Sequence, residues 1–386
     1  MTLIAIATGV AALIVSGGFV QDLYKQLGES VIHSQSGHLQ VARAAYFGEG
    51  SRSPEKQSIS DLATTKSEVG RIVGVKRVMA RLSFSGLLSN SRADQPIVGE
   101  GIEPEQEAEL STSIQLVAGR FPRRTDRYGA LIGEGLAKSL QLAPGSAVTL
   151  IANTIDGAIN TTELDVVGVF RSFSKDYDAR AVKIPLPAAQ ELLGLDTATT
   201  IVVLLTDTEL TNVVQERLAS AMRSHELVVK NWEELNDFYA NTVALYDRQF
   251  NVLKTIILFL IALGVSNSVN MAVMERMGEF GTMRALGNRT WHIVKLIMAE
   301  CLLLGCAGAL VGLVAGVVIA LLVSAIGIPM PPPPNSNIGY VASIAIAPRV
   351  AIQAMAIGAG ATIVAGLIPA LRARNVTIVN ALRTAI

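Results

Sequence analysis

The stretch Glu275-Arg-Met-Gly-Glu-Phe-Gly-Thr-Met-Arg-Ala-Leu-Gly287 is short and charged, and it lies between two long apolar runs. Neither residues 255–274 nor residues 301–348 contain an Asp, Glu, Lys or Arg. Each run is long enough to supply the ~20 residues that an α-helix needs to cross the core of a bilayer. We therefore expect the charged stretch to form a tight loop at one face of a membrane.

The composition divides the chain between membrane and water. Half of its 386 residues are hydrophobic, yet it carries 32 basic and 32 acidic side chains. Residues 251–386 hold nine basic groups against three acidic ones, which leaves 23 basic and 29 acidic groups in the first 250 residues. Cys301 and Cys306 both lie in an apolar run, so the polar part of the chain can have neither a disulfide framework nor a cysteine-ligated zinc site.

The N-terminal run, residues 3–20, is uncharged and fits either a membrane helix or the apolar core of a signal peptide. A signal peptide normally has a basic segment before this core, and only Met1 and Thr2 precede it here. A membrane helix is therefore the favoured interpretation. The polar residues 21–249 that follow alternate between strand-like and helix-like patterns, which indicates a mixed α+β domain of one or two lobes.

The remaining helices follow from spacing and from proline. Apolar residues recur every three or four positions from Trp232, so a helix continuous from 232 to 274 would be roughly 65 Å long and would form a rigid lever. Proline removes a backbone donor and fixes φ, so the five prolines between Gly327 and Asn337 must interrupt the second apolar run.

Basic residues predict the orientation. Arg276, Arg284 and Arg289 lie on one side of the membrane, and the segment after the last helix adds Arg372, Arg374 and Arg383, whereas residues 326–347 contain no basic residue. Both termini are therefore expected in the cytoplasm, and the large domain in the periplasm. The predicted order is transmembrane helix 1 (1–20), periplasmic α+β domain (21–231), stalk and helix 2 (232–274), cytoplasmic coupling loop (275–289), helix 3 (290–325), periplasmic loop (326–347), helix 4 (348–371) and cytoplasmic tail (372–386).

Small residues repeat at four-residue spacing on the last two helices, which lets helices approach closely in lipid. They could pack within the chain or form a dimer interface, and intrachain packing is favoured. The residues are Gly305, Gly308, Gly312 and Gly316 on the third helix, with Gly358, Thr362 and Gly366 on the fourth.

Motifs for catalysis are missing from the sequence. There is no phosphate-binding Gly-x-x-x-x-Gly-Lys-Ser/Thr, no His-Glu-x-x-His and no Gly-x-Ser-x-Gly, so neither a catalytic residue nor a bound cofactor is expected. His33 and His38 are five residues apart, a spacing that makes a poor metal site, and they are expected to be surface or packing residues, not metal ligands. Asp176 and Asp178 are expected in a solvated loop. Glu300 is a functional candidate because it lies in a membrane helix, although a structural role near the interface is as good an interpretation.

Several motifs resemble the FtsX-like permeases of ABC transporters, the group that contains MacB and the lipoprotein-releasing LolC and LolE. They are residues 275–287 followed by Glu300, Ser36-Gly-His-Leu-Gln-Val41, Gly119-Arg-Phe-Pro122 with Ile132-Gly-Glu-Gly-Leu-Ala137, and Pro369-Ala-Leu-Arg-Ala-Arg374 with Ala381-Leu-Arg383. The resemblance implies a four-helix, type VII permease that works as a dimer on a pair of separate ATPase subunits, which bind the ATP and magnesium. Members usually carry a basic segment before the first helix, whereas this sequence begins within that helix.

The resulting hypothesis is mechanotransmission. The coupling stretch would dock on the ATPase, with glycines permitting its turns, and the helix before it would carry the movement to the periplasmic domain. A structural alternative is that its charges only hold the loop at the lipid interface. The residues assigned to coupling are Glu275, Arg276, Gly278, Glu279, Gly281, Arg284, Ala285, Leu286 and Gly287.

The sequence leaves three alternatives for what this permease acts on. Similarity to the lipoprotein-releasing branch favours a lipoprotein or lipid of the bacterial inner membrane. A MacB-like exporter of peptides or amphiphilic drugs and an FtsX-like scaffold that controls a periplasmic partner are the alternatives. The expected partners are an ATPase dimer, a second permease copy or paralogue, membrane lipid or lipoprotein, and a periplasmic carrier or adaptor, with no nucleic acid.

Overall fold

The computed structural model describes residues 2–48, 57–332, 335–337 and 339–374, and the chain divides into two compact units. The helical unit comprises the described residues of Met1–Lys25, Thr242–Met330 and Val341–Ile386. The α/β unit comprises those of Gln26–Asn241 and Pro331–Tyr340. Most of the predicted cytoplasmic tail, including Arg383, and Pro333 and Pro334 of the proline cluster lie outside the described residues.

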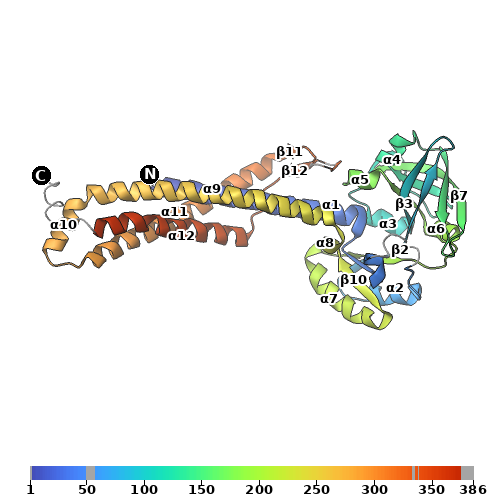
Figure 1. Ribbon diagram of the computed structural model, residues 1–386, viewed down its shortest axis with the longest axis horizontal. Coiled ribbons are helices and arrows are strands. Elements are labelled where there is room, and N and C mark those ends of the chain that lie inside the picture. Colours follow the sequence, from blue (N-terminus) through green and yellow to red (C-terminus); the bar gives the residue numbers. More distant parts are fainter. Residues whose placement is uncertain (1, 49–56, 333–334, 338, 375–386) are drawn as a thin grey trace. The chain divides into compact units, whose positions relative to one another are not determined.

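Four long helices build the helical unit and run alongside one another in it (Figure 1). They are α1 (Thr2–Val31), α9 (Asp237–Glu275), α11 (Thr290–Ile326) and α12 (Pro348–Arg374). Each is long and apolar enough to cross a membrane, so the prediction of four membrane helices is confirmed. The short helix α10 (Met277–Ala285) connects α9 to α11, and the strands β11 (Ile328–Met330) and β12 (Tyr340–Ala342) lie between α11 and α12.

Two helix boundaries differ from those expected. Helix α1 continues past residue 20 to Val31 and passes into the π-helix η1 (Ile32–Ser36). Leu23, Leu27 and Val31 are buried at four-residue spacing, so the polar extension remains amphipathic. The expected helix 232–274 is divided at Asn236 into α8 (Trp232–Leu235) and α9. The Asn236 side-chain oxygen accepts from the backbone N–H of Tyr239 at 2.9 Å, which caps the start of α9.

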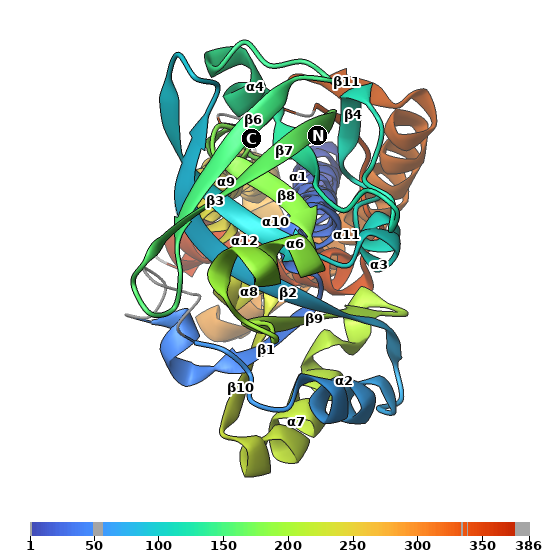
Figure 2. The same cartoon turned by 90° about the vertical axis from the view of Figure 1, so that its right-hand side faces the viewer.

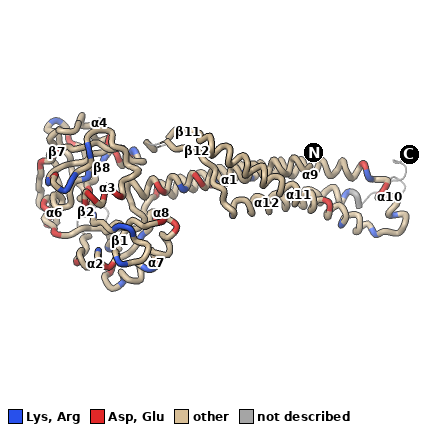
Figure 3. Tube along the Cα trace, turned by 180° about the vertical axis from the view of Figure 1, so that it is seen from behind, with Lys and Arg blue, Asp and Glu red and all other residues tan. Residues whose placement is uncertain are grey.

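Apolar side chains from all four helices form the core of the helical unit. Ile6, Val10 and Ile14 of α1 meet Val265 and Val269 of α9 there, together with residues of α10, α11 and α12. Figure 3 shows that charged residues gather around α10, whereas the middle parts of the helices are almost free of them. This distribution is the one that a bilayer core and its interface require.

The α/β unit is built on one mixed sheet with the strand order β10-β1-β9-β2-β3-β8-β5-β7-β4, in which β6 also pairs with β2 and β7. The strands are β1 (Leu39–Arg43), β2 (Val75–Ser89), β3 (Asp94–Ile102), β4 (Gln115–Gly119), β5 (Gly129–Gly133), β6 (Ala147–Asn153), β7 (Ile159–Arg171), β8 (Ala181–Pro185), β9 (Thr200–Leu205) and β10 (Leu227–Asn231). The helices are η2 (Ala44–Phe47), α2 (Leu62–Gly70), α3 (Pro104–Leu110), α4 (Glu134–Ser139), α5 (Lys175–Asp178), α6 (Leu186–Leu193), η5 (Thr208–Leu210), α7 (Thr211–Met222) and η6 (Arg223–His225). The predicted mixed α+β domain is thus confirmed.

The fifteen-residue strand β2 joins two lobes of this unit. Its first half pairs antiparallel with β9, and its second half pairs with β3 and β6. Strands β1, β9 and β10 with α2 and α7 enclose one apolar core, and β3 and β5–β8 with α4 and α6 enclose another. Figure 2 shows these two groups of elements in separate parts of the unit.

A buried ionic network lies in the α/β unit. Lys183 of β8 is 0 % exposed, and its Nζ contacts Glu107 of α3 and lies 3.3 Å from Oε2 of Glu100. Arg81 of β2 donates from Nη2 to Glu107 at 2.7 Å. Although burial alone would raise the pKa of Glu107, the neighbouring Arg81 and Lys183 hold this pKa below its usual range. Two cations and two carboxylates therefore compensate one another in a largely buried position.

Asp178 is buried, which corrects the expectation of a solvated loop. Both of its carboxylate oxygens accept from the backbone N–H of Ser172 at 3.0 Å, and one also accepts from the side-chain amide of Asn337 at 2.5 Å. Asn335 likewise donates to Asp176 at 2.7 Å. The segment after the proline cluster is thus hydrogen-bonded to α5, across 159 residues of chain.

His38 is a buried packing residue of the α/β unit. The backbone N–H of Leu205 lies 3.3 Å from its Nδ1 and donates to it, so Nε2 carries the proton and donates to Thr208 Oγ1 at 3.0 Å. Thr208 in turn donates to Glu29 at 2.7 Å. Burial, with a contribution from His33, lowers the pKa of His38 to about 4, although Glu29 and Asp207 act in the opposite direction.

Acidification is therefore expected to destabilise the α/β unit through His38. The pKa of His38 is about 4 in the folded state and ~6.5 in the unfolded state. The free energy of unfolding therefore decreases as the pH falls through this window, by about 2 kcal/mol between pH 7.5 and 5. Urea unfolding of the full-length Trp291→Phe protein, followed through buried Trp232, measures it. A His38→Gln variant should show a smaller loss, whereas His225→Gln, at a half-exposed histidine paired with Glu68, should match the parent. Equal pH dependence of all three proteins would contradict the assignment.

Candidate functional site

The charged stretch between α9 and α11 contains a helix, so the prediction of a tight loop is wrong. Residues Met277–Ala285 form α10, with Glu279 in its first turn and Arg284 in its last. These charges complement the helix dipole. Phe280 is buried in the apolar core of the helical unit. Burial of this aromatic side chain offsets the cost of about 1 kcal/mol that each interior glycine imposes on a helix.

Two of the three glycines that were expected to permit turns do not have that role. Gly278 and Gly281 lie within α10, where they do not form turns, and Gly281 is buried. Gly287 alone among them has a left-handed backbone, with φ of +95°. It follows the end of α10, at the position where a glycine commonly ends a helix. The turn that leads into α11 therefore depends on Gly287.

Arg276 connects three helices of the helical unit. It follows the last residue of α9, its Nε donates to Glu279 of α10 at 2.9 Å, and its Nη1 donates to Glu300 of α11 at 2.6 Å. Its guanidinium carbon also lies 5.7 Å from the centre of the Phe280 ring. Arg276 and Glu300 thus act together within the chain, and α10 is attached to both of its neighbours.

The other residues assigned to coupling lie at the surface of this segment. Leu286 is 86 % exposed, an unusual state for a large apolar side chain at the polar end of a helix bundle. Glu275, Glu279 and Ala285 are exposed, and Arg284 is half-buried. The segment therefore presents an apolar side chain surrounded by charges of both signs.

The small residues of α11 and α12 lie against other helices of the same chain. An added Cβ on Gly308 would lie 2.8 Å from Ile6, and one on Gly316 would lie 3.1 Å from Ile14, both in α1. Gly305 faces Thr362, Gly358 faces Val10, and Gly366 faces Cys301. Close packing of this kind replaces the hydrophobic driving force that helices lack in lipid. These contacts give every one of the glycines an intrachain neighbour.

A Gly312→Val substitution is expected to separate α11 from α1. The new Cβ would lie 2.6 Å from the backbone oxygen of Ala7 and 2.7 Å from Val10 Cβ, and backbone atoms cannot move aside. Overpacking of this kind costs about 1–3 kcal/mol. The thermal midpoint of the purified protein in detergent should fall, whereas Gly360→Val, whose new Cβ would meet no other part of the described chain within 4 Å, should leave it unchanged. A midpoint that Gly312→Val does not lower would exclude this packing.

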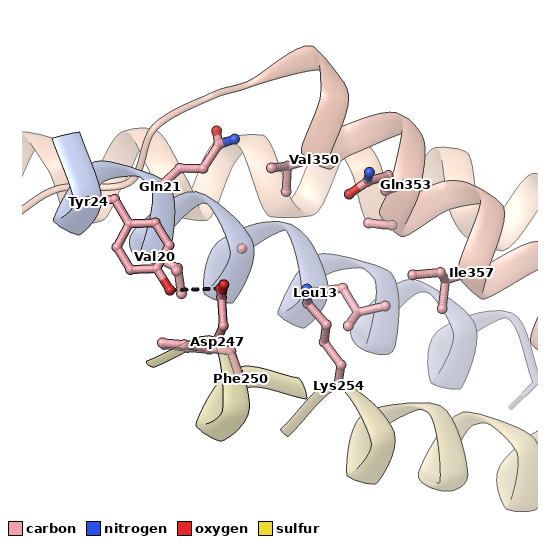
Figure 4. A pocket seen from close by; sticks show the side chains of 12 residues that line it. Leu13, Val20, Gln21, Tyr24, Asp247, Phe250, Lys254, Val350, Gln353 and Ile357 are labelled. Carbon is pink, nitrogen blue, oxygen red and sulfur yellow. Dashed lines mark hydrogen bonds between the residues drawn. The ribbon is translucent and has the colours of Figure 1, made fainter. Parts of the chain in front are cut away.

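A pocket of about 250 Å³ opens between α1, α9 and α12 in the helical unit. Figure 4 shows Tyr24 pointing towards Asp247, and the Tyr24 hydroxyl donates to Asp247 Oδ1 at 2.8 Å. Lys254 reaches the same space from α9, and Gln21 and Gln353 approach it from α1 and α12. The remaining lining is largely apolar: Leu13, Gly17, Val20, Phe250, Val350, Ala354 and Ile357. The pocket is therefore amphiphilic.

Sequence reasoning did not single out this pocket, although a signal was present. Lys254 lies directly before the uncharged run 255–274 of α9, and an ionisable residue in a membrane helix marks a candidate functional site. Among the described residues, no group of three or more His, Cys, Asp and Glu side chains is arranged to hold a metal ion.

Two family models match the chain. Residues 1–221, more than half of it, match the MacB-like periplasmic core domain, and residues 251–378 match the FtsX-like permease C-terminal model. The lipoprotein-releasing system transmembrane protein LolC of Neisseria meningitidis is 24 % identical over 333 residues, which are 83 % of this chain and 76 % of that protein. LolE of Haemophilus influenzae is 22 % identical over 82 % of this chain and 76 % of its own.

A further relative and a solved structure are similar to parts of the chain. The macrolide export ATP-binding/permease protein MacB of Bdellovibrio bacteriovorus is 24 % identical over 83 % of this chain, which spans about half (51 %) of that protein. The crystal structure of the periplasmic region of MacB from Actinobacillus actinomycetemcomitans aligns with 53 % of this chain over 92 % of its own length. The sequence identity is 16 % and the TM-score is 0.38. The chain belongs to the FtsX-like permeases of ABC transporters with a MacB-like periplasmic core domain, and its four helices cross the inner membrane and carry the α/β unit on the periplasmic side.

Proposed function

We propose that this permease couples ATP hydrolysis by a separate ATPase subunit to conformational change in its periplasmic domain. The observation that carries the proposal is the construction of α10. Leu286, which directly follows this helix, is exposed at a position where a partner could contact it, and Arg276 attaches the helix to α9 and α11. If the ATPase displaced α10, the movement would therefore reach α9 and α11, because the Arg276 side chain bonds α10 to α11 and directly follows α9.

The ATPase contact consists of Leu286 with the surrounding Glu275, Glu279, Arg284 and Ala285. An apolar anchor within a polar rim is the arrangement that concentrates binding energy in protein interfaces. The ATPase binds the ATP and magnesium, this chain holds no cofactor, and the transporter contains a dimer of ATPase subunits. A second permease copy or a paralogue completes it.

A Leu286→Asp substitution tests this contact. Placing a carboxylate at the centre of the interface should reduce recovery of the ATPase with the purified permease at least tenfold, since a buried unpaired charge is costly. Val73→Asp, at a residue of the α/β unit that is 79 % exposed, is the matched control and should leave recovery unchanged. Undiminished recovery of the ATPase with the Leu286→Asp permease would show that Leu286 lies outside the interface.

The cargo that we propose is a lipoprotein or lipid of the inner membrane, which a periplasmic carrier or adaptor then receives. Two observations support it. The pocket between α1, α9 and α12 combines apolar walls with Asp247 and Lys254, as an amphiphile with a polar head requires. In addition, relatives named for lipoprotein release align over three quarters of their own length.

MacB-like export of peptides or amphiphilic drugs is the second candidate, because a MacB protein aligns over 83 % of this chain. Purification of the complex from native membranes separates the two. Co-purifying lipoproteins that stimulate ATP hydrolysis would support release, whereas stimulation by macrolides or peptides and recovery of an outer-membrane channel would support export. If neither class stimulates hydrolysis and a cell-wall hydrolase is recovered, the chain is a signalling scaffold and both cargo proposals are wrong.

A further inference from the structure

A polar cavity of about 250 Å³ lies within the α/β unit. Its walls come from segments distant in sequence, among them Gln35 of η1, Arg81 of β2, Glu100 of β3 and Tyr177 of α5. Leu235 and Asn236, which directly precede α9, also line it. The cavity is separate from the pocket of the helical unit, and neither the coupling helix nor the cargo proposal uses it.

The cavity borders the buried ionic network of this unit. The side chain of Arg81 is only 4 % exposed and that of Glu100 only 12 %. Arg81 is held in place because its Nη1 donates to the backbone oxygen of Gln35 and its Nη2 donates to Glu107. The position of the Arg81 guanidinium is therefore determined by the protein.

Several buried polar atoms of the cavity have unused hydrogen-bonding capacity. Among the residues that the structure describes, Nε of Arg81, Oε2 of Glu100 and Nε2 of Gln35 are buried and make no hydrogen bond, although Oε2 of Glu100 is also ion-paired with Lys183 at 3.3 Å. Nε of Arg81 and Oε2 of Glu100 lie 3.7 Å apart, which is too far for a direct hydrogen bond. A donor and an acceptor at this separation match a molecule that has an acceptor and a donor on neighbouring atoms.

The charges around the cavity limit the ligand to one without net charge. Arg81 and Lys183 balance Glu100 and Glu107, so a net-charged ligand would add an uncompensated charge at a buried site. Burial, with Glu100 nearby, raises the pKa of Tyr177 well above its usual range, so this hydroxyl remains protonated and able to donate. The volume is well above the ~10–15 Å³ that a single bridging water needs.

We propose that this cavity binds a small, net-neutral polar molecule that has a hydrogen-bond acceptor beside a donor, as in an amino-acid zwitterion or the adjacent hydroxyls of a sugar. The acceptor is bound by Arg81 Nε and Gln35 Nε2, and the donor is bound by Glu100 Oε2. Because the cavity also includes the residues directly before α9, occupancy and the conformation of this junction are thermodynamically linked.

Ligand-detected saturation-transfer NMR on the full-length protein in lipid nanodiscs tests the proposal. The probes are glycine and D-glucose as net-neutral molecules, with acetate and ethylammonium as charged controls of similar size to glycine. We expect saturable binding of glycine or glucose at millimolar concentration and none of either charged control. The neutral probe that binds identifies the class as amino acid or sugar.

Gln35→Ala and Gln95→Ala are the matched variants. Nε2 of Gln35 donates to no group among the described residues, so Gln35→Ala should leave the fold intact and weaken binding about tenfold, as expected for one hydrogen bond. Gln95, a half-buried glutamine of β3 outside the cavity, should leave the affinity unchanged. The proposal is wrong if no neutral probe binds, in which case the cavity holds water only. It is equally wrong if the charged probes bind as well as the neutral ones or if Gln35→Ala has no effect.

Discussion

An Arg276→Ala permease is expected to assemble with its ATPase and to fold normally, yet to lose at least 90 % of ATP-driven cargo movement. Arg276 links α10 to α11 through two hydrogen bonds. Its side chain donates to Glu300 of α11 at 2.6 Å and to Glu279 of α10 at 2.9 Å. The side chains of Arg276 and Glu300 are 38 % and 43 % exposed. An ion pair at this exposure contributes at most about 1 kcal/mol to stability. The loss is therefore one of coupling, not of folding.

Reconstituted transport and the thermal midpoint, measured on the same preparations, distinguish these effects. Arg289→Ala removes an exposed arginine from the same connection between α10 and α11 and should retain most of the transport. The exchanged pair, Arg276→Glu with Glu300→Arg, should recover part of the activity because the bond is restored with reversed polarity. Full activity of Arg276→Ala, or a large fall in its midpoint, would argue against a coupling role.

A Lys183→Met substitution is expected to cause the largest loss of stability, about 3–5 kcal/mol in the periplasmic domain. Lys183 is fully buried and contacts Glu107 and Glu100. Its removal leaves two buried carboxylates with only Arg81 to compensate them, whereas methionine preserves most of the volume. Urea unfolding of the full-length Trp291→Phe protein, followed through buried Trp232, measures the change.

Charge balance explains the cost, and a second substitution checks this. Lys183→Met combined with Glu107→Gln leaves Arg81 opposite Glu100, so the charges remain balanced. The loss of unfolding free energy in the double variant should therefore be smaller than the sum of the losses in the two single variants. Glu191→Gln, which breaks the exposed pair with Arg127, should cost less than about 1 kcal/mol. Additive losses in the double variant would mean that packing, not charge, is what Lys183 supplies.

Features carried by local runs of residues could be predicted from the sequence. Long uncharged segments predict membrane helices wherever they occur, because a bilayer accepts few unpaired charges. All four were predicted, as were the mixed α+β character of the domain and the family of the chain. The pattern did not predict the strand order, in which β1 lies between β9 and β10, because such pairing joins residues about 160 to 190 positions apart.

The coupling stretch shows why local patterns can mislead. Three glycines and alternating charges within thirteen residues predict a loop when each residue is weighed by its own propensity. The chain forms α10 instead, because Phe280 enters the apolar core of the helical unit. Asp178 is a similar case: it has a polar neighbourhood in sequence but is buried, since Asn337 and the backbone of Ser172 satisfy its oxygens.

The sequence alone determined that this protein crosses a membrane four times and that a charged segment separates its second and third helices, since hydrophobic length and charge are properties of single segments. The tertiary structure decided what that segment is. Arg276 and Glu300 are 24 positions apart, and only folding brings them within 2.6 Å. The polar cavity likewise exists only because η1, β2, β3 and α5 meet. Contacts between distant residues depend on how helices and strands pack, which no periodicity along the chain records.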